Sequence, residues 1–200
     1  MREFFFEKGR AETAAQVEQV IQSLGRALGS CREVTPPTSI TEMHRVHRLL
    51  MAYECAEVHC DLFASRRELY GPGIASLIEE GTKISVEDYQ AAKNRTSEIQ
   101  ESWRETFNSF DVLAMPTTAG PAPASLATTG DPRWQSPWSL CGFPAITLPC
   151  GLSAEEMPVG LQLVSAENAL LLAIAAECEE RLAFQATPTF RTTSEMDSET

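Results

Sequence analysis

Two short apolar runs, Ala145–Leu148 and Val159–Val164, constrain the fold of this chain more than any other feature of its sequence. Proline or glycine borders each run, and Ile, Val and Thr supply the branched side chains that suit a pleated surface. A turn-rich connection separates the two runs. We therefore predict a pair of buried strands within one layered unit.

Apolar residues repeat at helical spacing in four longer segments. Their three- and four-residue steps place apolar side chains on one face of a helix. We predict helices over residues 12–28, 41–69, 85–110 and 167–183. Thr41 is expected to cap the second helix, and Ser85 with Asp88 has the form of a capping box at the start of the third.

Short apolar stretches follow two of these helices. We predict strands at Cys31–Val34, after the first helix, and at Asp111–Met115, after the third. Before the third helix, Tyr70–Gly73 breaks the chain and a short apolar stretch, Ile74–Ile78, follows. Helices that alternate with strands are typical of an α/β sandwich, so the predicted fold class is α/β.

The charge of the chain limits its partners. The 200 residues include 28 acidic and 16 basic side chains, which gives a formal net charge of −12. This surplus repels phosphate backbones, so we expect no direct contact with nucleic acid. The longest apolar run, Ala169–Ala176, is far shorter than the roughly 20 residues of a membrane span, so we expect no membrane partner either.

The six cysteines are expected to be free thiols. A chain of this length and apolar content can form its core without disulfides. The first residues, MREFFFEKGR, lack the long apolar run of a secretory signal. We therefore expect a cytoplasmic protein.

The sequence offers little support for metal or thiol chemistry. Cys55 and His59 lie four residues apart on a predicted helix, but zinc sites need more ligands and no C-x-x-C motif is present. Cys141 and Cys150 lie at strand margins, while all three histidines cluster on one distant helix. There is no G-x-S-x-G elbow or glycine-rich phosphate loop. We expect no metal site, no cofactor and no cysteine nucleophile.

A long proline-rich loop, Pro116–Ser136, precedes the two central strands. Loops of this length are commonly functional, and this one leads into two tryptophans that suit the wall of a small-molecule pocket. Trp134 and Trp138 are therefore candidate pocket residues. The alternative is ordinary packing, because tryptophan is often mostly buried.

Three segments together resemble the C-terminal region of the amidase signature family. They are DYQAAKNR at Asp88–Arg95, DVLAMPTTAGPAPA at Asp111–Ala124 and SPWSLCGFPAITLPCGLSAEEMPVGLQLV at Ser136–Val164. The resemblance covers about residues 2–184. It implies that the loop ahead of the G-x-P segment lines the substrate pocket, so the candidate pocket residues are Trp134, Ser136, Trp138 and Cys141. It implies a partial amidase-like α/β/α sandwich over residues 1–185, with a mixed central sheet flanked by helices and without the catalytic N-terminal portion. Residues 186–200 are expected to form a polar, disordered tail.

The resemblance also implies a reaction whose catalytic groups lie elsewhere. Members of the family cleave an amide C–N bond through an acyl-serine intermediate, using a Ser–cis-Ser–Lys triad located upstream of the matched region. This chain has no Ser-Ser pair, and its only lysines, Lys8, Lys83 and Lys93, cannot be matched to the catalytic lysine. We therefore predict no catalytic residue in this chain and no activity by the chain alone.

Several interpretations remain open. The chain is expected to be a truncated product, a fragment or one half of a split amidase, which takes a small amide substrate when an N-terminal portion or a homo-oligomer completes it. The first alternative is a non-catalytic binding or scaffold remnant. The second is a fragment of a tRNA-dependent amidotransferase A-type subunit.

Overall fold

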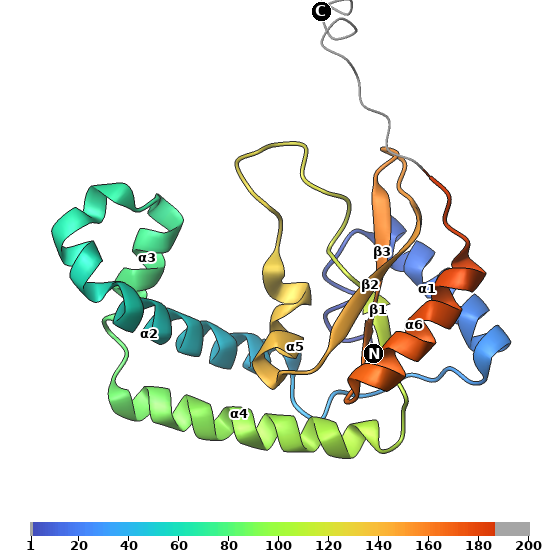
Figure 1. Cartoon of the computed structure of the whole chain (residues 1–200), viewed down its shortest axis with the longest axis horizontal. Helices are drawn as coiled ribbons and strands as arrows, with labels where there is room; N and C mark the ends of the chain where they lie inside the picture. The colour runs from blue at the N-terminus through green and yellow to red at the C-terminus, as the bar shows by residue number, and fades with distance from the viewer. Residues whose placement is uncertain (1, 187–200) are drawn as a thin grey trace, which may run out of the picture.

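The computed structural model describes residues 2–186, which form helices on both sides of a small sheet (Figure 1). The tail predicted at 186–200 lies, apart from its first residue, outside the described residues. In chain order the elements are α1 (Ala11–Leu28), α2 (Ile40–Arg66), η1 (Arg67–Leu69), α3 (Pro72–Gly81), α4 (Val86–Phe107), β1 (Leu113–Pro116), η2 (Pro132–Trp134), α5 (Ser136–Cys141), β2 (Ala145–Leu152), β3 (Pro158–Val164) and α6 (Asn168–Leu182).

The three strands form one antiparallel sheet in the order β1-β3-β2. The apolar runs Ala145–Leu148 and Val159–Val164 are both strands, and the predicted strand at Asp111–Met115 corresponds to β1. In the register of the sheet, Gln162 on the central strand lies opposite Met115 on one side and Thr147 on the other. The chain is thus a mixed α/β structure, as predicted.

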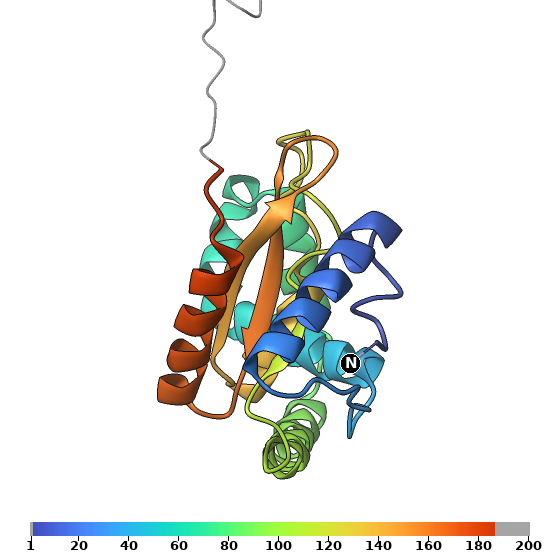
Figure 2. The ribbon, with the colours of Figure 1, turned by 90° about the vertical axis from the view of Figure 1, so that its right-hand side faces the viewer.

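Each face of the sheet is covered by a different group of helices. Alternation along β3 sends Val159, Leu161 and Leu163 to a core shared with α1 and α6, which lie over the same face of the sheet (Figure 2). Val164, Leu113 and Met115 belong to a second core with α2, α4 and α5. The sheet therefore separates two apolar layers, as in an α/β/α sandwich.

The predicted strand at Cys31–Val34 is wrong. These residues have no strand conformation, and the first three are exposed. Arg32 explains the difference, because its guanidinium lies 4.4 Å from the Phe110 ring centroid and donates a hydrogen bond to the Ser109 carbonyl. The segment therefore lies against the residues that follow α4 and does not pair with a strand of the sheet.

The helix caps match the prediction only in part. Ser39, not Thr41, caps α2, because its Oγ accepts a hydrogen bond from the Glu42 backbone N–H at 3.2 Å. At α4 the first bond of the predicted capping box is present, because the Asp88 N–H donates to Ser85 Oγ at 3.0 Å. The Asp88 carboxylate accepts from the Ser85 hydroxyl at 2.9 Å and not from the Ser85 backbone N–H, so the reciprocal bond of the box is not formed.

The apolar stretch Ile74–Ile78 belongs to helix α3, which packs against α2. Gly81 permits this close approach, because a Cβ at that position would lie 1.9 Å from the Ala52 carbonyl oxygen. On another side of α2, Trp103 of α4 is buried and its Nε1 donates to the sulfur of Met43 at 3.4 Å. These contacts join α2, α3 and α4 into the arm that extends from the sheet in Figure 1.

Candidate functional site

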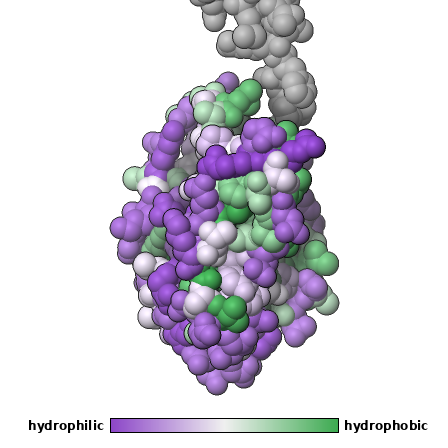
Figure 3. All heavy atoms as spheres, turned by 90° about the vertical axis from the view of Figure 1, so that its left-hand side faces the viewer, coloured by the Kyte–Doolittle hydropathy of each residue, from purple (hydrophilic) through white to green (hydrophobic). Residues whose placement is uncertain are grey.

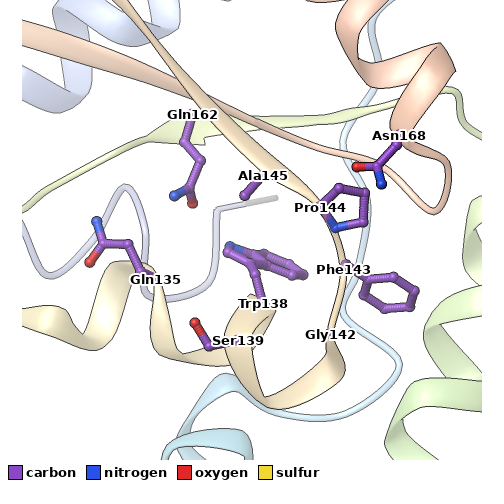
Figure 4. Close-up of a pocket in the computed structure, with 9 residues that line it drawn as sticks. All are labelled: Gln135, Trp138, Ser139, Gly142, Phe143, Pro144, Ala145, Gln162 and Asn168. Atoms are coloured by element: carbon purple, nitrogen blue, oxygen red, sulfur yellow. The ribbon is translucent and has the colours of Figure 1, made fainter.

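A hollow of about 390 Å³ lies where α5 meets the sheet (Figure 4). The segment Ser136–Cys141, for which the sequence predicts no helix, is helix α5. Pro137 near its start and Gly142 just after its end, at φ 65°, fit a one-and-a-half-turn helix of this length. Residues that line the hollow come from this helix and its flanks, from β2, from β3 and from the start of α6: Gln135, Trp138, Phe143, Pro144, Ala145, Gln162 and Asn168 among them.

Aromatic packing holds Trp138 in place beside the hollow. Its ring stacks on Phe5, with centroids 5.8 Å apart, and meets Trp103 edge-on at 5.3 Å. Gln135, one turn earlier, donates from Nε2 to the carbonyl oxygen of Thr117 and so ties α5 to the strand end. The wall of the hollow is therefore fixed by the core behind it.

Two buried polar atoms at the hollow have no hydrogen-bond partner in the described chain. They are Oε1 of Gln162, a residue with 2% of its surface exposed, and Nε1 of Trp138, with 1%. In Figure 4 the Gln162 side chain extends from β3 toward the nitrogen edge of the Trp138 indole. Leaving one such atom unpaired costs about 1–3 kcal/mol.

The four predicted pocket residues do not come together at the hollow. Trp138 lines it, whereas Trp134, Ser136 and Cys141 are buried in the core beside it. Trp134 packs on Phe4 with ring centroids 4.6 Å apart. Of the four, Trp138 is therefore the one that lines the hollow.

Gln162 was not predicted as a site residue, although the sequence carries a signal for it. It is a polar residue within the otherwise apolar end of β3, where the neighbouring side chains are buried. A buried polar side chain in a central strand needs a partner and is for that reason a candidate site residue. That Gln162 lines the same hollow as Trp138 of α5 is evident only from the three-dimensional structure.

The thiols near the site are poor nucleophiles. Burial raises the pKa of Cys141 to about 12 and that of Cys150 to about 11, so both remain protonated at neutral pH. The imidazole of His44 hydrogen bonds through Nε2 to the Arg133 carbonyl at 2.8 Å. Among residues 2–186, no hydrogen bond joins a histidine to a cysteine, and no cluster of metal-ligating side chains is found.

All three lysines of the chain are exposed. Lys8, Lys83 and Lys93 lie at the surface, and the Lys93 ammonium rests 5.5 Å from the Tyr89 ring centroid. A lysine that acts as a base near neutral pH has to be buried, because burial lowers the pKa of its ammonium. No lysine of this chain occupies such an environment.

Across the described helices, none combines the length and apolar content that crossing a membrane requires.

Comparison with known sequences relates most of the chain to amidases. The family model described as Amidase matches residues 1–169. The putative amidase AmiD of Mycobacterium tuberculosis is 31% identical over 126 residues, which cover 58% of this chain and 26% of AmiD. The A-type subunit of the glutamyl-tRNA(Gln) amidotransferase from Granulibacter bethesdensis is 28% identical over 200 residues, covering 91% of this chain and 40% of that protein.

A solved structure likewise matches most of this chain, while this chain matches only part of that structure. A crystal structure of an amidase superposes with a TM-score of 0.77 at 24% identity, covering 90% of this chain and 44% of the amidase. The three-stranded sheet and its helices are therefore part of the larger amidase fold. The chain spans less than half the length of these relatives. On the family match over most of its length, this chain is a member of the amidase family.

Proposed function

We propose that this chain is the C-terminal part of an amidase, which hydrolyses an amide C–N bond only when a second portion of the fold supplies the catalytic groups. The observation that carries the proposal is the partial match: 90% of the chain superposes on an amidase, yet it accounts for 44% of that structure. The contribution of this part is the hollow beside α5. The substrate of the complete enzyme is a small amide.

We further propose that the Ser–cis-Ser–Lys triad is absent and that the chain alone is inactive. The exposed positions of Lys8, Lys83 and Lys93 support this, because none is desolvated enough to serve as the base. The high pKa of Cys141 removes the nearest alternative nucleophile. Without an activated nucleophile, the rate enhancement of an acyl-transfer mechanism is lost.

The partner of this chain is then the portion of the amidase fold that it lacks, and an exposed apolar stripe on α2 supports this. Met51, Cys55, Val58 and Leu62 follow one another at four-, three- and four-residue steps on one side of the helix. Val58 is 78% exposed and Leu62 51%. Figure 3 shows hydrophobic patches among hydrophilic residues at the end of the molecule where α2 meets α3.

A stripe of this spacing is what a packed helix normally buries. Each Å² of apolar surface removed from water stabilises the assembly by about 25 cal/mol. Because the chain matches only part of the amidase fold, we propose that the missing portion of the fold covers this stripe. Self-association of the chain is the alternative that would also cover it.

A second candidate is a segment of a tRNA-dependent amidotransferase A-type subunit. Its support is the match to the Granulibacter protein, which covers 91% of this chain. The net charge of −12 disfavours direct contact between this chain and tRNA, so partner subunits would have to bind the tRNA.

The proposal is tested by assaying amide hydrolysis by the purified chain, alone and mixed with the amino-terminal part of a relative such as AmiD. We expect no hydrolysis of p-nitroacetanilide above the buffer rate by the chain alone and measurable hydrolysis by the mixture. Hydrolysis by the chain alone would refute the absence of a triad. The DNA upstream of codon 1 provides a second test, because an in-frame Gly/Ser-rich coding stretch with a lysine would identify the missing portion directly.

A further inference from the structure

We propose that the apolar stripe of α2 binds a helix of the missing portion of the fold, and that this helix carries an apolar stripe of its own with basic residues along one side. The inference rests on the proposed function for the source of that helix. The chemistry of the helix follows from the side chains that surround the α2 stripe.

The α2 stripe has the spacing that a second helix matches. Its four residues, Met51, Cys55, Val58 and Leu62, are separated by steps of four, three and four. Helices that pack side by side along their length use this alternation, because the side chains of one fit between those of the other. A strand repeats its side chains every two residues and does not match such a stripe. The spacing therefore favours a helix as the occupant.

Helix α3 closes one side of the stripe. Ala52 and Ala56 each follow a stripe residue in the sequence, and both are buried where Gly81 of α3 passes close to them. An approaching helix therefore meets the opposite side of the stripe, where residues 54 and 61 lie.

That open side is acidic. Glu54 and Asp61 are exposed and lie seven residues apart, so both carboxylates fall on the same side of α2. The Tyr89 hydroxyl donates to Glu54 at 3.0 Å, which holds this carboxylate in place without neutralising its charge. Within residues 2–186, neither carboxylate takes part in an ion pair. Lysine or arginine on the partner helix would supply the missing opposite charge.

The same charges disfavour a second copy of this chain as the occupant. In a twofold pair of antiparallel α2 helices, the same side of each helix faces its counterpart, so Glu54 and Asp61 of one copy would meet the acidic side of the other. In a parallel pair, the acidic side of each copy would face the side that α3 already covers. A partner of different sequence, with basic residues beside its apolar stripe, avoids both conflicts.

Two synthetic peptides of three heptads serve as probes of this chemistry. Both have leucine at the two apolar positions of each heptad. One has lysine and the other glutamate at the two flanking positions, and glutamine and alanine fill the remaining positions of both. Like charges along the flanks disfavour pairing of each peptide with itself. Isothermal titration calorimetry with the full chain measures the affinity of each peptide.

The lysine peptide should bind about tenfold more tightly than the glutamate peptide at low salt, because two exposed charge pairs become attractive instead of repulsive. Salt screens exposed charges, so this preference should nearly vanish at about 1 M NaCl. Val58→Ser/Leu62→Ser should weaken binding of the lysine peptide at least about tenfold, since the apolar contact is then lost.

Glu54→Lys/Asp61→Lys should reverse the preference between the two peptides. Glu105→Lys/Glu180→Lys is the matched control, because it changes the net charge by the same amount at exposed positions of α4 and α6. The control variant should still prefer the lysine peptide. The pair of variants thus separates attraction to the side of the stripe from attraction to the net charge of −12.

Three results would overturn the inference. The first is equal affinity of the unsubstituted chain for the two peptides at low salt, and the second is a preference that Glu54→Lys/Asp61→Lys leaves unchanged. The third is a dimer of the chain in sedimentation velocity that Val58→Ser/Leu62→Ser dissociates, because a second copy would then occupy the stripe. The proposed function would survive all three, since restored hydrolysis in the mixture tests it independently.

Discussion

Gly81 of α3 and Ala52 of α2 approach so closely that a Cβ at position 81 would lie 1.9 Å from the Ala52 carbonyl oxygen. No side chain fits in that space, and the obstructing atom belongs to the backbone of a long helix. The seam between α2 and α3 therefore depends on the absence of a side chain at one position.

Replacing Gly81 with Ala is expected to lower the free energy of unfolding by about 2–3 kcal/mol, because the added methyl group forces the two helices apart. Urea denaturation followed by circular dichroism measures the change. Gly73→Ala, also in α3, is the control, since nothing lies within 4 Å of its Cβ position. That variant should be neutral or slightly stabilising. Equal effects of the two substitutions would contradict the close approach.

Val58→Glu should leave the isolated chain within about 0.5 kcal/mol of its original stability, because the side chain is 78% exposed. The same change should weaken association with an amino-terminal amidase portion at least about tenfold, since a charge then replaces an apolar contact. Titration calorimetry or restored hydrolysis measures the second effect. Glu57→Gln, at an exposed neighbouring position outside the stripe, is the control and should associate normally. Normal association of Val58→Glu would exclude the α2 stripe from the interface.

The stability of the chain should fall as the pH drops below about 6.5. Burial lowers the pKa of His44 and of His47 from the usual 6.5, so the unfolded chain takes up protons there before the folded chain does. Their contribution to stability is complete above that pH and is lost as the pH falls toward the lowered values. Urea midpoints at pH 7.5 and 5.5 measure the change. In the double variant His44→Gln/His47→Gln, we expect a smaller difference between the two midpoints; an unchanged difference would place the titrating groups elsewhere.

The cysteines should react with iodoacetamide in two classes. Cys31 and Cys60 are exposed, whereas Cys141 is buried with its pKa raised to about 12 from 9.0. That shift alone lowers the thiolate fraction near pH 8 about a thousandfold. Peptide mass spectrometry after timed labelling should find Cys31 and Cys60 modified first, and Cys141 only after urea unfolds the chain. Early labelling of Cys141 under native conditions would contradict its burial.

The sheet could be predicted because its strands carry strong local signals. Ala145–Leu148 and Val159–Val164 combine branched residues with proline at their borders, and these signals do not depend on distant contacts. Cys31–Val34 carries a much weaker signal, because two of its four residues are charged. In the structure Arg32 of this segment contacts Phe110, and the segment is not a strand. Helix α5, with six residues, is too short for a helical period to be recognised.

The hollow could be predicted only in part. Trp138 stood out because tryptophan close to a long loop is conspicuous, but the same reasoning selected Trp134, which does not line the hollow. Gln162 lies 24 positions further along the chain than Trp138, and only the three-dimensional fold brings the two side chains to one hollow. Local sequence patterns contain no information on that meeting.

The order of the strands has a consequence for how the chain is made. The central strand, β3, is the last of the three in the sequence, and both other strands pair with it. During synthesis, β1 and β2 therefore remain unpaired until β3, which ends at Val164, has emerged from the ribosome. Folding of the sheet is a late, all-at-once event, and chains that stop before Pro158 should expose unpaired strand edges that promote aggregation.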